Sequence, residues 1–222
     1  MFRMVDAIHF NSQSTADVYG KYIDVHAESK VVAITHRGVE DHRKRRYYSK
    51  KVLRLGFIGS ETPYKGLPIL KRVITMLNAD GLENKIELNV YGGKVGIDKV
   101  LPNVLFKGRF SAPQMKSVYD SMDLLVVPSI WYETFSLTTL EALSYGVPVL
   151  VSDSVGAQDI VKEYDTSYVY HTEEELRAKL QLLANDKSEL VEYNKRILSQ
   201  PWKHGMREHA QEVVDRIYKS SE

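Results

Sequence analysis

Two glutamates mark the stretch of sequence with the clearest chemical potential. Glu133 and Glu141 lie eight positions apart in the segment PSIWYETFSLTTLEALSYGVP, residues 128–148. We expect the first in a loop after an apolar strand and the second about one turn inside the following helix. The first amides of a helix lack intrahelical partners and attract anions. The segment therefore predicts a site that offers one ligand a carboxylate, a group of N–H donors and a second carboxylate, an order that suits a phosphorylated sugar.

A lysine is a second candidate group. Lys65 lies in the sequence GSETPYKG, residues 59–66, between an apolar run and a segment of helical length. Open α/β sheets bind ligands at the carboxyl ends of their strands, next to helix N-termini. An ammonium there could stabilise the negative charge of a departing diphosphate. The alternatives are plainer: a lysine in such a loop is often only solvated, and a glutamate at a helix start can simply favour the helix dipole.

The elements that would position these groups follow from the apolar pattern. The strand candidates are Val5–Phe10, Lys30–Thr35, Val52–Ile58, Ile86–Tyr91, Val104–Phe106, Asp123–Val127, Val147–Val151 and Ser167–Tyr170. The helix candidates span residues 13–23, 66–79, 112–121, 137–145, 156–163, 173–185, 187–199 and 203–219. Alternating strands and helices predict an α/β fold, a Rossmann-like parallel sheet with helices on both faces.

A basic segment is the best candidate for a domain boundary. Residues 36–54 hold eight Lys or Arg against two acidic residues, whereas the net charge of all 222 residues is only +1. We expect residues 1–36 to be the remnant of a larger N-terminal domain, because one strand–helix–strand unit cannot cover both faces of a sheet. Residues 37–51 are then a basic linker, 52–200 a complete α/β domain and 201–222 a C-terminal helix. The linker is either a solvated connection or a patch that contacts anionic lipid or an anionic acceptor.

Composition excludes several classes of protein. The chain has no cysteine, which rules out disulfides, thiol nucleophiles and cysteine-based zinc sites and makes the cytosol the default location. A net charge of +1 lacks the basic excess of a dedicated nucleic-acid-binding protein. No run approaches the roughly 18 apolar residues of a membrane span. The first residues, MFRMVDAIHFNSQS, turn polar too early for a signal peptide.

With these motifs in place, the chain resembles the C-terminal, donor-binding domain of a GT-B retaining glycosyltransferase of glycosyltransferase family 4. The most specific element is the E-x7-E motif Glu133…Glu141. Supporting elements are P-x-K-G at residues 63–66, YGG at 91–93 and LFKG at 105–108. The resemblance covers about residues 52–165, and HRGVED at 36–41 is similar to the phrase that usually closes the first domain.

The resemblance implies a reaction. Such enzymes transfer a sugar with retention from a UDP- or GDP-sugar to a polysaccharide or glycolipid acceptor, and they need no metal or other cofactor. The sequence agrees with the last point, because it contains no D-x-D motif that could hold a divalent ion on a diphosphate. Residues 1–36 would belong to the acceptor-side domain, residues 52–200 would bind the nucleotide sugar, and the last helix would pack toward the first domain. We expect a cytoplasmic protein, with peripheral contact at the inner face of the membrane.

The resemblance also assigns roles to residues. Glu133 and Lys65 would be catalytic, the first on the donor sugar hydroxyls and the second on the diphosphate. The residues expected to bind the donor sugar and phosphate are Ser60, Phe135, Ser136, Leu137 and Thr138. Those expected to bind the nucleoside are Glu141, Arg109, Phe110, Tyr91 and Gly92. The expected ligands are thus a nucleotide sugar and a glycan or glycolipid, with no nucleic acid.

Some features depart from the family pattern. Ser60 stands where members often have an arginine, and Ser136 stands where others have a glycine. His9 and His36 could be catalytic, although a lone histidine is more often structural. We expect residues 1–36 to match only the end of the family's acceptor-side half. A second hypothesis is therefore a catalytically incomplete nucleotide-sugar-binding module, either a truncated product or one subunit of a split transferase whose N-terminal half is a partner chain.

Overall fold

The computed structural model describes residues 5–22, 27–48 and 51–219. Its centre is a seven-stranded sheet in the order β5-β6-β4-β3-β7-β8-β9. The strands are β3 (Leu53–Ile58), β4 (Ile86–Tyr91), β5 (Val95–Ile97), β6 (Val104–Gly108), β7 (Leu124–Val127), β8 (Val149–Ser152) and β9 (Val169–Tyr170). All neighbours are parallel except β5, which is antiparallel to β6. The predicted α/β fold with a parallel sheet is confirmed, and β5 is an addition that the sequence did not predict.

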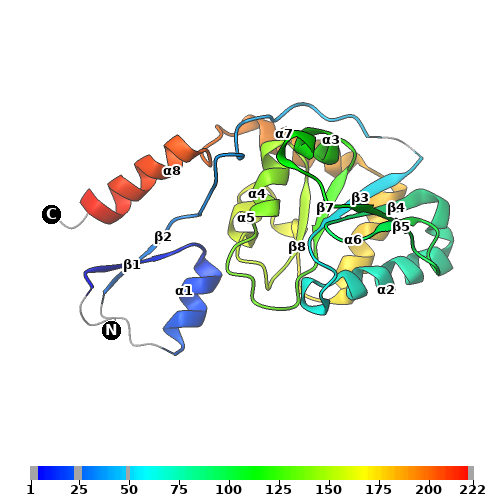
Figure 1. Cartoon of the computed structure of the whole chain (residues 1–222), viewed down its shortest axis with the longest axis horizontal. Helices are drawn as coiled ribbons and strands as arrows, with labels where there is room; N and C mark the ends of the chain where they lie inside the picture. Colours follow the sequence, from blue (N-terminus) through cyan, green and yellow to red (C-terminus); the bar gives the residue numbers. More distant parts are fainter. Residues whose placement is uncertain (1–4, 23–26, 49–50, 220–222) are drawn as a thin grey trace.

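Helices flank both faces of this sheet (Figure 1). The helices of the domain are α2 (Leu67–Leu77), α3 (Met115–Asp120), α4 (Leu137–Ser144), α5 (Gln158–Tyr164), α6 (Glu173–Asn185) and α7 (Ser188–Ser199). Right-handed crossovers place α2 on one face and α3, α4 and α5 on the other, because the chain moves in opposite directions along the sheet after β3 and after β6. Helix α6 contacts α2, and α7 contacts α5 and α6. Single helical turns span Pro63–Lys65, Asn78–Leu82, Glu83–Lys85, Ala112–Gln114, Thr166–Tyr168 and Val214–Tyr218.

The core lies between the sheet and these helices. All four residues of β7 and all four of β8 are buried. Strands that are apolar along their whole length are typical of parallel sheets covered on both faces. Helix α2 buries Leu67, Leu70, Val73, Ile74 and Leu77. This three-to-four-residue spacing is the amphipathic stripe that holds the helix, and the loop before it, against the sheet.

Residues before the basic segment form a small separate sheet. Strands β1 (Ala7–Phe10) and β2 (Glu28–Val31) pair in parallel around α1 (Gln13–Gly20). This unit and α8 (Met206–Val213) lie at the same end of the molecule (Figure 1). Strand β2 begins two residues before the predicted strand Lys30–Thr35 and ends four residues before its end, because Glu28 pairs with Ala7. Parts of the expectations for residues 1–4, 23–26, 49–50 and 220–222 lie outside the described residues.

Helix α1 is held against the larger domain by polar contacts. The Ser12 hydroxyl donates to the Thr134 carbonyl at 2.7 Å, and the Gln13 amide donates to the Asp159 carboxylate at 2.7 Å. Ser12 also caps α1 by accepting from the Thr15 amide. The first unit therefore contacts the loop that carries Glu133. The boundary at residue 36 stays a prediction.

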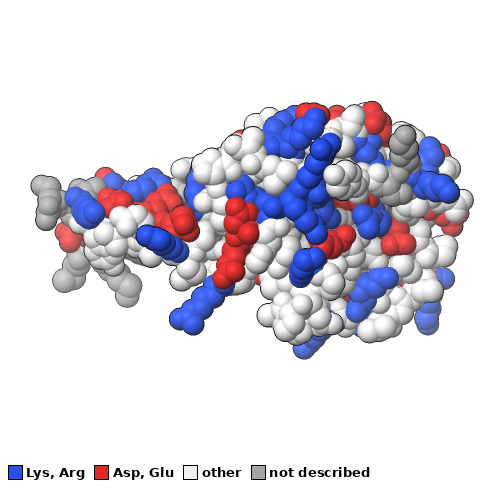
Figure 2. All heavy atoms as spheres, turned by 90° about the horizontal axis from the view of Figure 1, so that it is seen from above, with Lys and Arg blue, Asp and Glu red and all other residues white. Residues whose placement is uncertain are grey.

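Within the basic segment, residues 37–48 of the linker run along the surface of the domain (Figure 1). Val39 is only 1% exposed, and Arg46, 9% exposed, donates to the carbonyls of Tyr119 and Met122. Burial lowers the pKa of Arg46. Lys44 pairs with Asp120 at 2.7 Å. Figure 2 shows Lys and Arg interspersed with Asp and Glu on the face seen from above. Val39 and Arg46 therefore anchor the segment to the domain, whereas residues 40–42, 44 and 45 are exposed, so both interpretations of the linker stay predictions.

Candidate functional site

Lys65 and Glu133 meet at the switch point of the sheet. Strands β4, β5 and β6 lie on one side of β3, and strands β7, β8 and β9 lie on the other. In such sheets the loops after the two central strands diverge and leave a crevice at their carboxyl ends. Lys65 comes from the loop after β3 and Glu133 from the loop after β7. Lys65 Nζ lies 2.7 Å from Glu133 Oε1, so the structure joins the two residues that the sequence predicted as catalytic.

The two loops are locked together through the backbone. The Ile130 amide donates to the Tyr64 carbonyl at 2.9 Å. Gly66, next to Lys65, has a left-handed conformation with φ of 79°. A Cβ atom on Gly66 would overlap the carbonyl oxygen of Pro128. The glycine of the P-x-K-G motif is therefore what lets the start of α2 approach the end of β7, and with it Lys65 approach Glu133.

Both carboxylate oxygens of Glu133 are occupied. Lys65 contacts one, and the Ser129 hydroxyl donates to the other at 2.6 Å. Ser129 was not among the residues predicted from the sequence, although a hydroxyl directly after Pro128 was a usable signal. A 190 Å³ cavity lies here, and its lining residues are Tyr64, Lys65, Ser129, Trp131, Tyr132 and Glu133. Trp131 and Tyr132 are 71% and 67% exposed, so two large aromatic rings border the ion pair.

Helix α4 begins next to this pair in an unusual way. Ser136 is its N-cap, yet its side chain caps no backbone amide of the first turn, and its hydroxyl instead contacts those of Thr138 and Thr139, each at 3.1 Å. Among the described residues, Ser136 is the one non-glycine residue with positive φ, at 135°. This conformation suits the glycine that the resembled family places here. The first amides of α4, which include those of Leu137 and Thr138, lack a side-chain cap and remain available to an anion. Phe135, also expected to bind the donor through its amide, has its ring buried in the core.

Glu141 lies further along α4 with partners of its own. Its Oε1 is 2.9 Å from His36 Nε2, and its Oε2 accepts from the Tyr119 hydroxyl at 2.6 Å. Tyr119 is fully buried. Burial first, and then the Glu141 carboxylate, raise the pKa of Tyr119 well above its usual value, so the phenol keeps its proton and donates it. The sequence did not predict these partners of Glu141.

The other predicted nucleoside contacts lie at the same edge of the sheet. The Gly59 amide donates to the Tyr91 carbonyl at 3.0 Å, and the Gly92 amide donates to the Gly108 carbonyl at 2.8 Å. These bonds join the loops after β3, β4 and β6. The Phe110 ring meets Tyr91 edge to face, with centroids 5.8 Å apart.

The remaining candidates are Arg109 and Ser60 in the α/β domain and His9 in the N-terminal unit. Arg109 is exposed on the loop after β6, and the Ser60 hydroxyl contacts that of Thr62 at 2.7 Å. His9 Nε2 lies 2.7 Å from the Val32 carbonyl oxygen within the small N-terminal sheet. That contact indicates a structural role, so the structure gives no support to His9 as a catalytic group.

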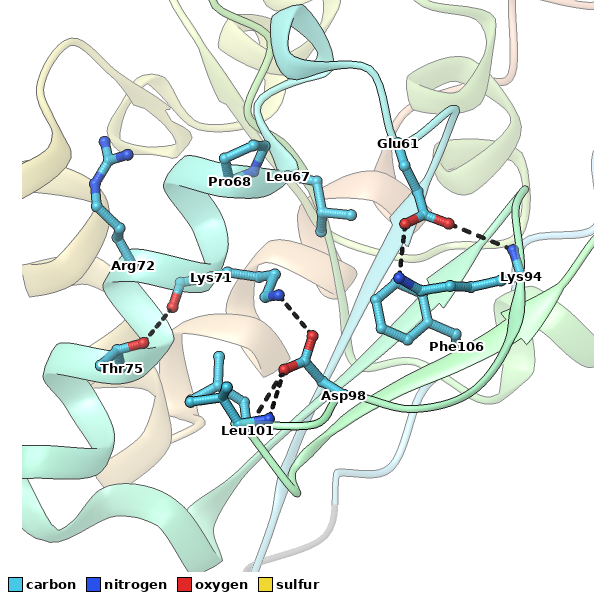
Figure 3. A pocket seen from close by; sticks show the side chains of 11 residues that line it. Glu61, Leu67, Pro68, Lys71, Arg72, Thr75, Lys94, Asp98, Leu101 and Phe106 are labelled. Atoms are coloured by element: carbon cyan, nitrogen blue, oxygen red, sulfur yellow. Dashed lines mark hydrogen bonds and ion pairs between the residues drawn. The ribbon is translucent and has the colours of Figure 1, made fainter.

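A second cavity, of 430 Å³, lies beside α2 and β5 (Figure 3). Lys71 pairs with Asp98 at 2.5 Å, and Lys94 pairs with Glu61 at 3.1 Å and lies over the Phe106 ring. It is larger than the cavity at Lys65 but lies at the edge of the sheet, away from the switch point. We therefore take the smaller cavity as the candidate site. In the described residues, no group of three or more Asp, Glu or His side chains lies close enough to hold a metal ion.

A mostly parallel α/β sheet with a cation, a carboxylate and a helix N-terminus at its switch point is typical of α/β domains that bind anionic ligands at this edge. Residues 39–199 match the family model described as Glycosyl transferases group 1, and the chain belongs to this family.

Two curated relatives agree with this assignment. A GDP-mannose-dependent alpha-mannosyltransferase of Mycolicibacterium smegmatis is 33% identical over 110 residues, which are 48% of this chain and 27% of that protein. A D-inositol 3-phosphate glycosyltransferase of Rhodococcus jostii is 28% identical over 151 residues, which are 61% of this chain and 33% of that protein. The chain thus spans about a third or less of these relatives.

Solved structures share the fold. The crystal structure of TarM superposes with a TM-score of 0.73 at 17% identity, over 96% of this chain and 44% of TarM. Anabaena HepE in complex with UDP and glucose gives a TM-score of 0.72 at 15% identity, over 96% of this chain and 63% of HepE. These likenesses establish the fold as that of GT-B glycosyltransferases. In the described part of the chain, no helix combines the length and apolar character needed to cross a membrane.

Proposed function

We propose that this chain supplies the donor-binding half of a retaining glycosyltransferase of family 4, which moves a sugar from a UDP- or GDP-sugar to a polysaccharide or glycolipid acceptor. The observation that carries the proposal is the contact between Lys65 and Glu133 at the switch point, beside the uncapped start of α4. The names of two similar proteins support either nucleotide, because one is GDP-mannose-dependent and the other was solved with UDP and glucose.

The proposed chemistry assigns each group one task. The diphosphate binds at the first amides of α4 and at the Lys65 ammonium. As the bond between the anomeric carbon of the sugar and the diphosphate breaks, its electrons move to the leaving oxygen, and these donors stabilise the charge that develops there. An acceptor hydroxyl oxygen bonds to the same carbon, and its proton passes to the released diphosphate. Glu133 contacts the sugar hydroxyls. Without a ligand, Lys65 and Glu133 neutralise each other, so a bound diphosphate competes with Glu133 for the ammonium.

The nucleoside is proposed to lie along the neighbouring loops. Glu141 accepts from the ribose hydroxyls, while Tyr91 and Phe110 border the base together with the backbone at Gly92 and Arg109. No metal or other cofactor takes part in this proposal, since Lys65 and the helix amides supply the positive charge. We expect nucleotide binding and turnover to be unchanged in excess EDTA. If EDTA abolished binding or turnover and Mg²⁺ restored it, the proposal that no metal takes part would be contradicted.

The test compares two lysines that both form ion pairs. In calorimetry, Lys65→Ala is expected to lower the affinity for UDP or GDP by about 10- to 100-fold, the range for one charged hydrogen bond. The affinity for the corresponding nucleoside should fall by less than about twofold, because the nucleoside has no phosphate. Lys94→Ala removes a lysine paired with Glu61 in the cavity of Figure 3, and it should leave both affinities unchanged. Equal losses for nucleotide and nucleoside in Lys65→Ala would refute the diphosphate role.

A catalytically incomplete binding module is the second candidate. It is favoured by the fact that the donor-side residues Lys65 and Glu133 are brought together within the α/β domain alone. Incubation of the purified chain with UDP- and GDP-sugars separates the two candidates. Transfer or hydrolysis supports the enzyme, binding without turnover supports the module, and no binding refutes both.

The acceptor side and the location are also proposals. A glycolipid acceptor would bring the protein to the cytoplasmic face of a membrane. Arg45 and the 80% exposed Tyr47 beneath it, 5.5 Å from guanidinium to ring centroid, are residues of the basic segment that could contact anionic lipid. Co-sedimentation with vesicles containing anionic lipid, lost in Arg45→Glu, is the expected result. Equal sedimentation with neutral vesicles would contradict it.

A further inference from the structure

The turn at residues 36–39 fixes one imidazole in place. The Gly38 amide donates to His36 Nδ1 at 3.1 Å, and the Val39 amide donates to the His36 carbonyl at 2.9 Å. A Cβ on Gly38 would lie 2.9 Å from His36 Cε1, so the ring and the turn fit closely only with glycine there. A ring nitrogen that accepts a hydrogen bond carries no proton, so the ring proton is on Nε2.

That proton faces Glu141. His36 Nε2 therefore donates to Glu141 Oε1 at 2.9 Å, while the Tyr119 hydroxyl donates to Oε2 at 2.6 Å. One fixed donor on each oxygen holds the carboxylate in a single orientation. Each carboxylate oxygen can accept more than one hydrogen bond, so both keep capacity for a ligand.

The two donors are themselves held by the segment that leads from β2 into the domain. His36 belongs to it directly. Tyr119 is fully buried and stacks on Tyr145 with centroids 5.1 Å apart, and Tyr145 stacks on His42 at 4.8 Å. The His42 amide also donates to the Ser144 carbonyl, at the end of α4. The orientation of Glu141 thus depends on how residues 36–42 lie against α4.

We propose that His36 and Tyr119 are positioning residues for Glu141, which orient its carboxylate toward the two hydroxyls of a nucleotide ribose and make the site select ribose over deoxyribose. This inference rests on the proposed function, because it assumes that Glu141 meets the nucleoside. It goes further because it assigns the selectivity to two residues that do not touch the ligand. One of them, His36, lies outside the α/β domain that the sequence predicted at residues 52–200.

The experiment measures selectivity in addition to affinity. Calorimetry on the full chain compares UDP with 2′-deoxy-UDP, and GDP with 2′-deoxy-GDP. In the unaltered protein we expect the deoxy form to bind about 10- to 100-fold more weakly, the range for one lost hydrogen bond to a charged group. In His36→Ala we expect the ribose form to lose most of that advantage while the deoxy form changes less than about twofold.

Matched variants separate positioning from folding. In His36→Gln the side-chain amide can donate from near the place of Nε2, so this variant should keep the ratio between the two forms. Tyr119→Phe removes only the hydroxyl, keeps the stacked ring and should lower the ratio as His36→Ala does. His171→Ala removes another histidine–carboxylate contact, 3.0 Å from Asp153, and should leave the ratio unchanged.

Each failure has a distinct meaning. An unchanged ratio in His36→Ala, with normal binding of UDP or GDP, overturns the positioning role and leaves the donor site intact. Equal weakening of ribose and deoxyribose forms, not restored in His36→Gln, also overturns it, because that pattern is general loss of structure. If the unaltered protein binds neither UDP nor GDP, both the proposed donor-binding function and this inference are refuted.

Discussion

The packing of Gly66 against Pro128 gives a quantitative prediction. Gly66→Ala puts a Cβ where φ is 79° and where the carbonyl oxygen of Pro128 lies. The left-handed conformation alone costs a residue other than glycine about 1–2 kcal/mol. The overlap adds about 1–3 kcal/mol, typical of overpacking, because a backbone carbonyl cannot rotate away as a side chain can. A total near 3 kcal/mol should lower the Tm by about 6–12 °C in a domain of this size.

A second glycine isolates the overlap. Gly81 has nearly the same φ, 82°, but no atom lies within 4 Å of a Cβ built on it. Gly81→Ala therefore carries only the conformational cost, about 1–2 kcal/mol, and should lower the Tm by about 2–8 °C. Thermal unfolding by circular dichroism measures both. In calorimetry, Gly66→Ala should also bind nucleotide more weakly than Gly81→Ala does, since it separates Lys65 from Glu133. Equal Tm values for the two variants would refute the close contact between the loops.

Three further predictions concern other parts of the chain. Ser136→Gly should raise the Tm relative to Ser136→Ala, because only glycine adopts φ of 135° without strain, and equal Tm values would show that α4 starts differently in solution. Burial lowers the pKa of His204 from 6.5 to about 4. Between these values the unfolded state binds a proton that the folded state does not, so stability should fall by about 3 kcal/mol as the pH drops from 7 to 4. In urea unfolding, the stability of His204→Phe should fall less between pH 7 and 4 than that of the unaltered protein. An equal fall would contradict the buried position of His204. Arg46→Ala should destabilise the protein by about 3 kcal/mol, because two buried carbonyls lose their donor, while Arg45→Ala next to it should change stability by less than about 0.5 kcal/mol. Similar effects of both would mean that the basic segment does not pack as described.

The parts of the fold that local sequence determines were predicted well. Strand Ile86–Tyr91 and helix Glu173–Asn185 have the predicted bounds, and in the structure Thr172 caps this helix by accepting from the Glu175 amide. Strand β5 was missed because Val95–Ile97 is only three exposed residues, and it exists through its pairing with β6. The bounds of β2 were wrong for the same reason, since a strand on the other side of α1 sets them.

The site shows the same division. The sequence motif placed Glu133, Lys65 and the start of α4 at one edge of the sheet, because each follows a strand directly. It did not reveal that Lys65 touches Glu133, 68 residues away, or that His36 reaches Glu141 over 105 residues. Those contacts depend on how the loops pack in three dimensions, which no local pattern encodes. The positive φ of Ser136 was indicated in the sequence only by the glycine that the resembled family has at that position.

The most direct test of the account is a crystal structure of this chain with UDP or GDP bound. The account predicts the diphosphate at Lys65 and the first amides of α4, and the ribose hydroxyls at Glu141. A nucleotide found instead in the larger cavity beside α2, next to Lys71 and Lys94 (Figure 3), would contradict it.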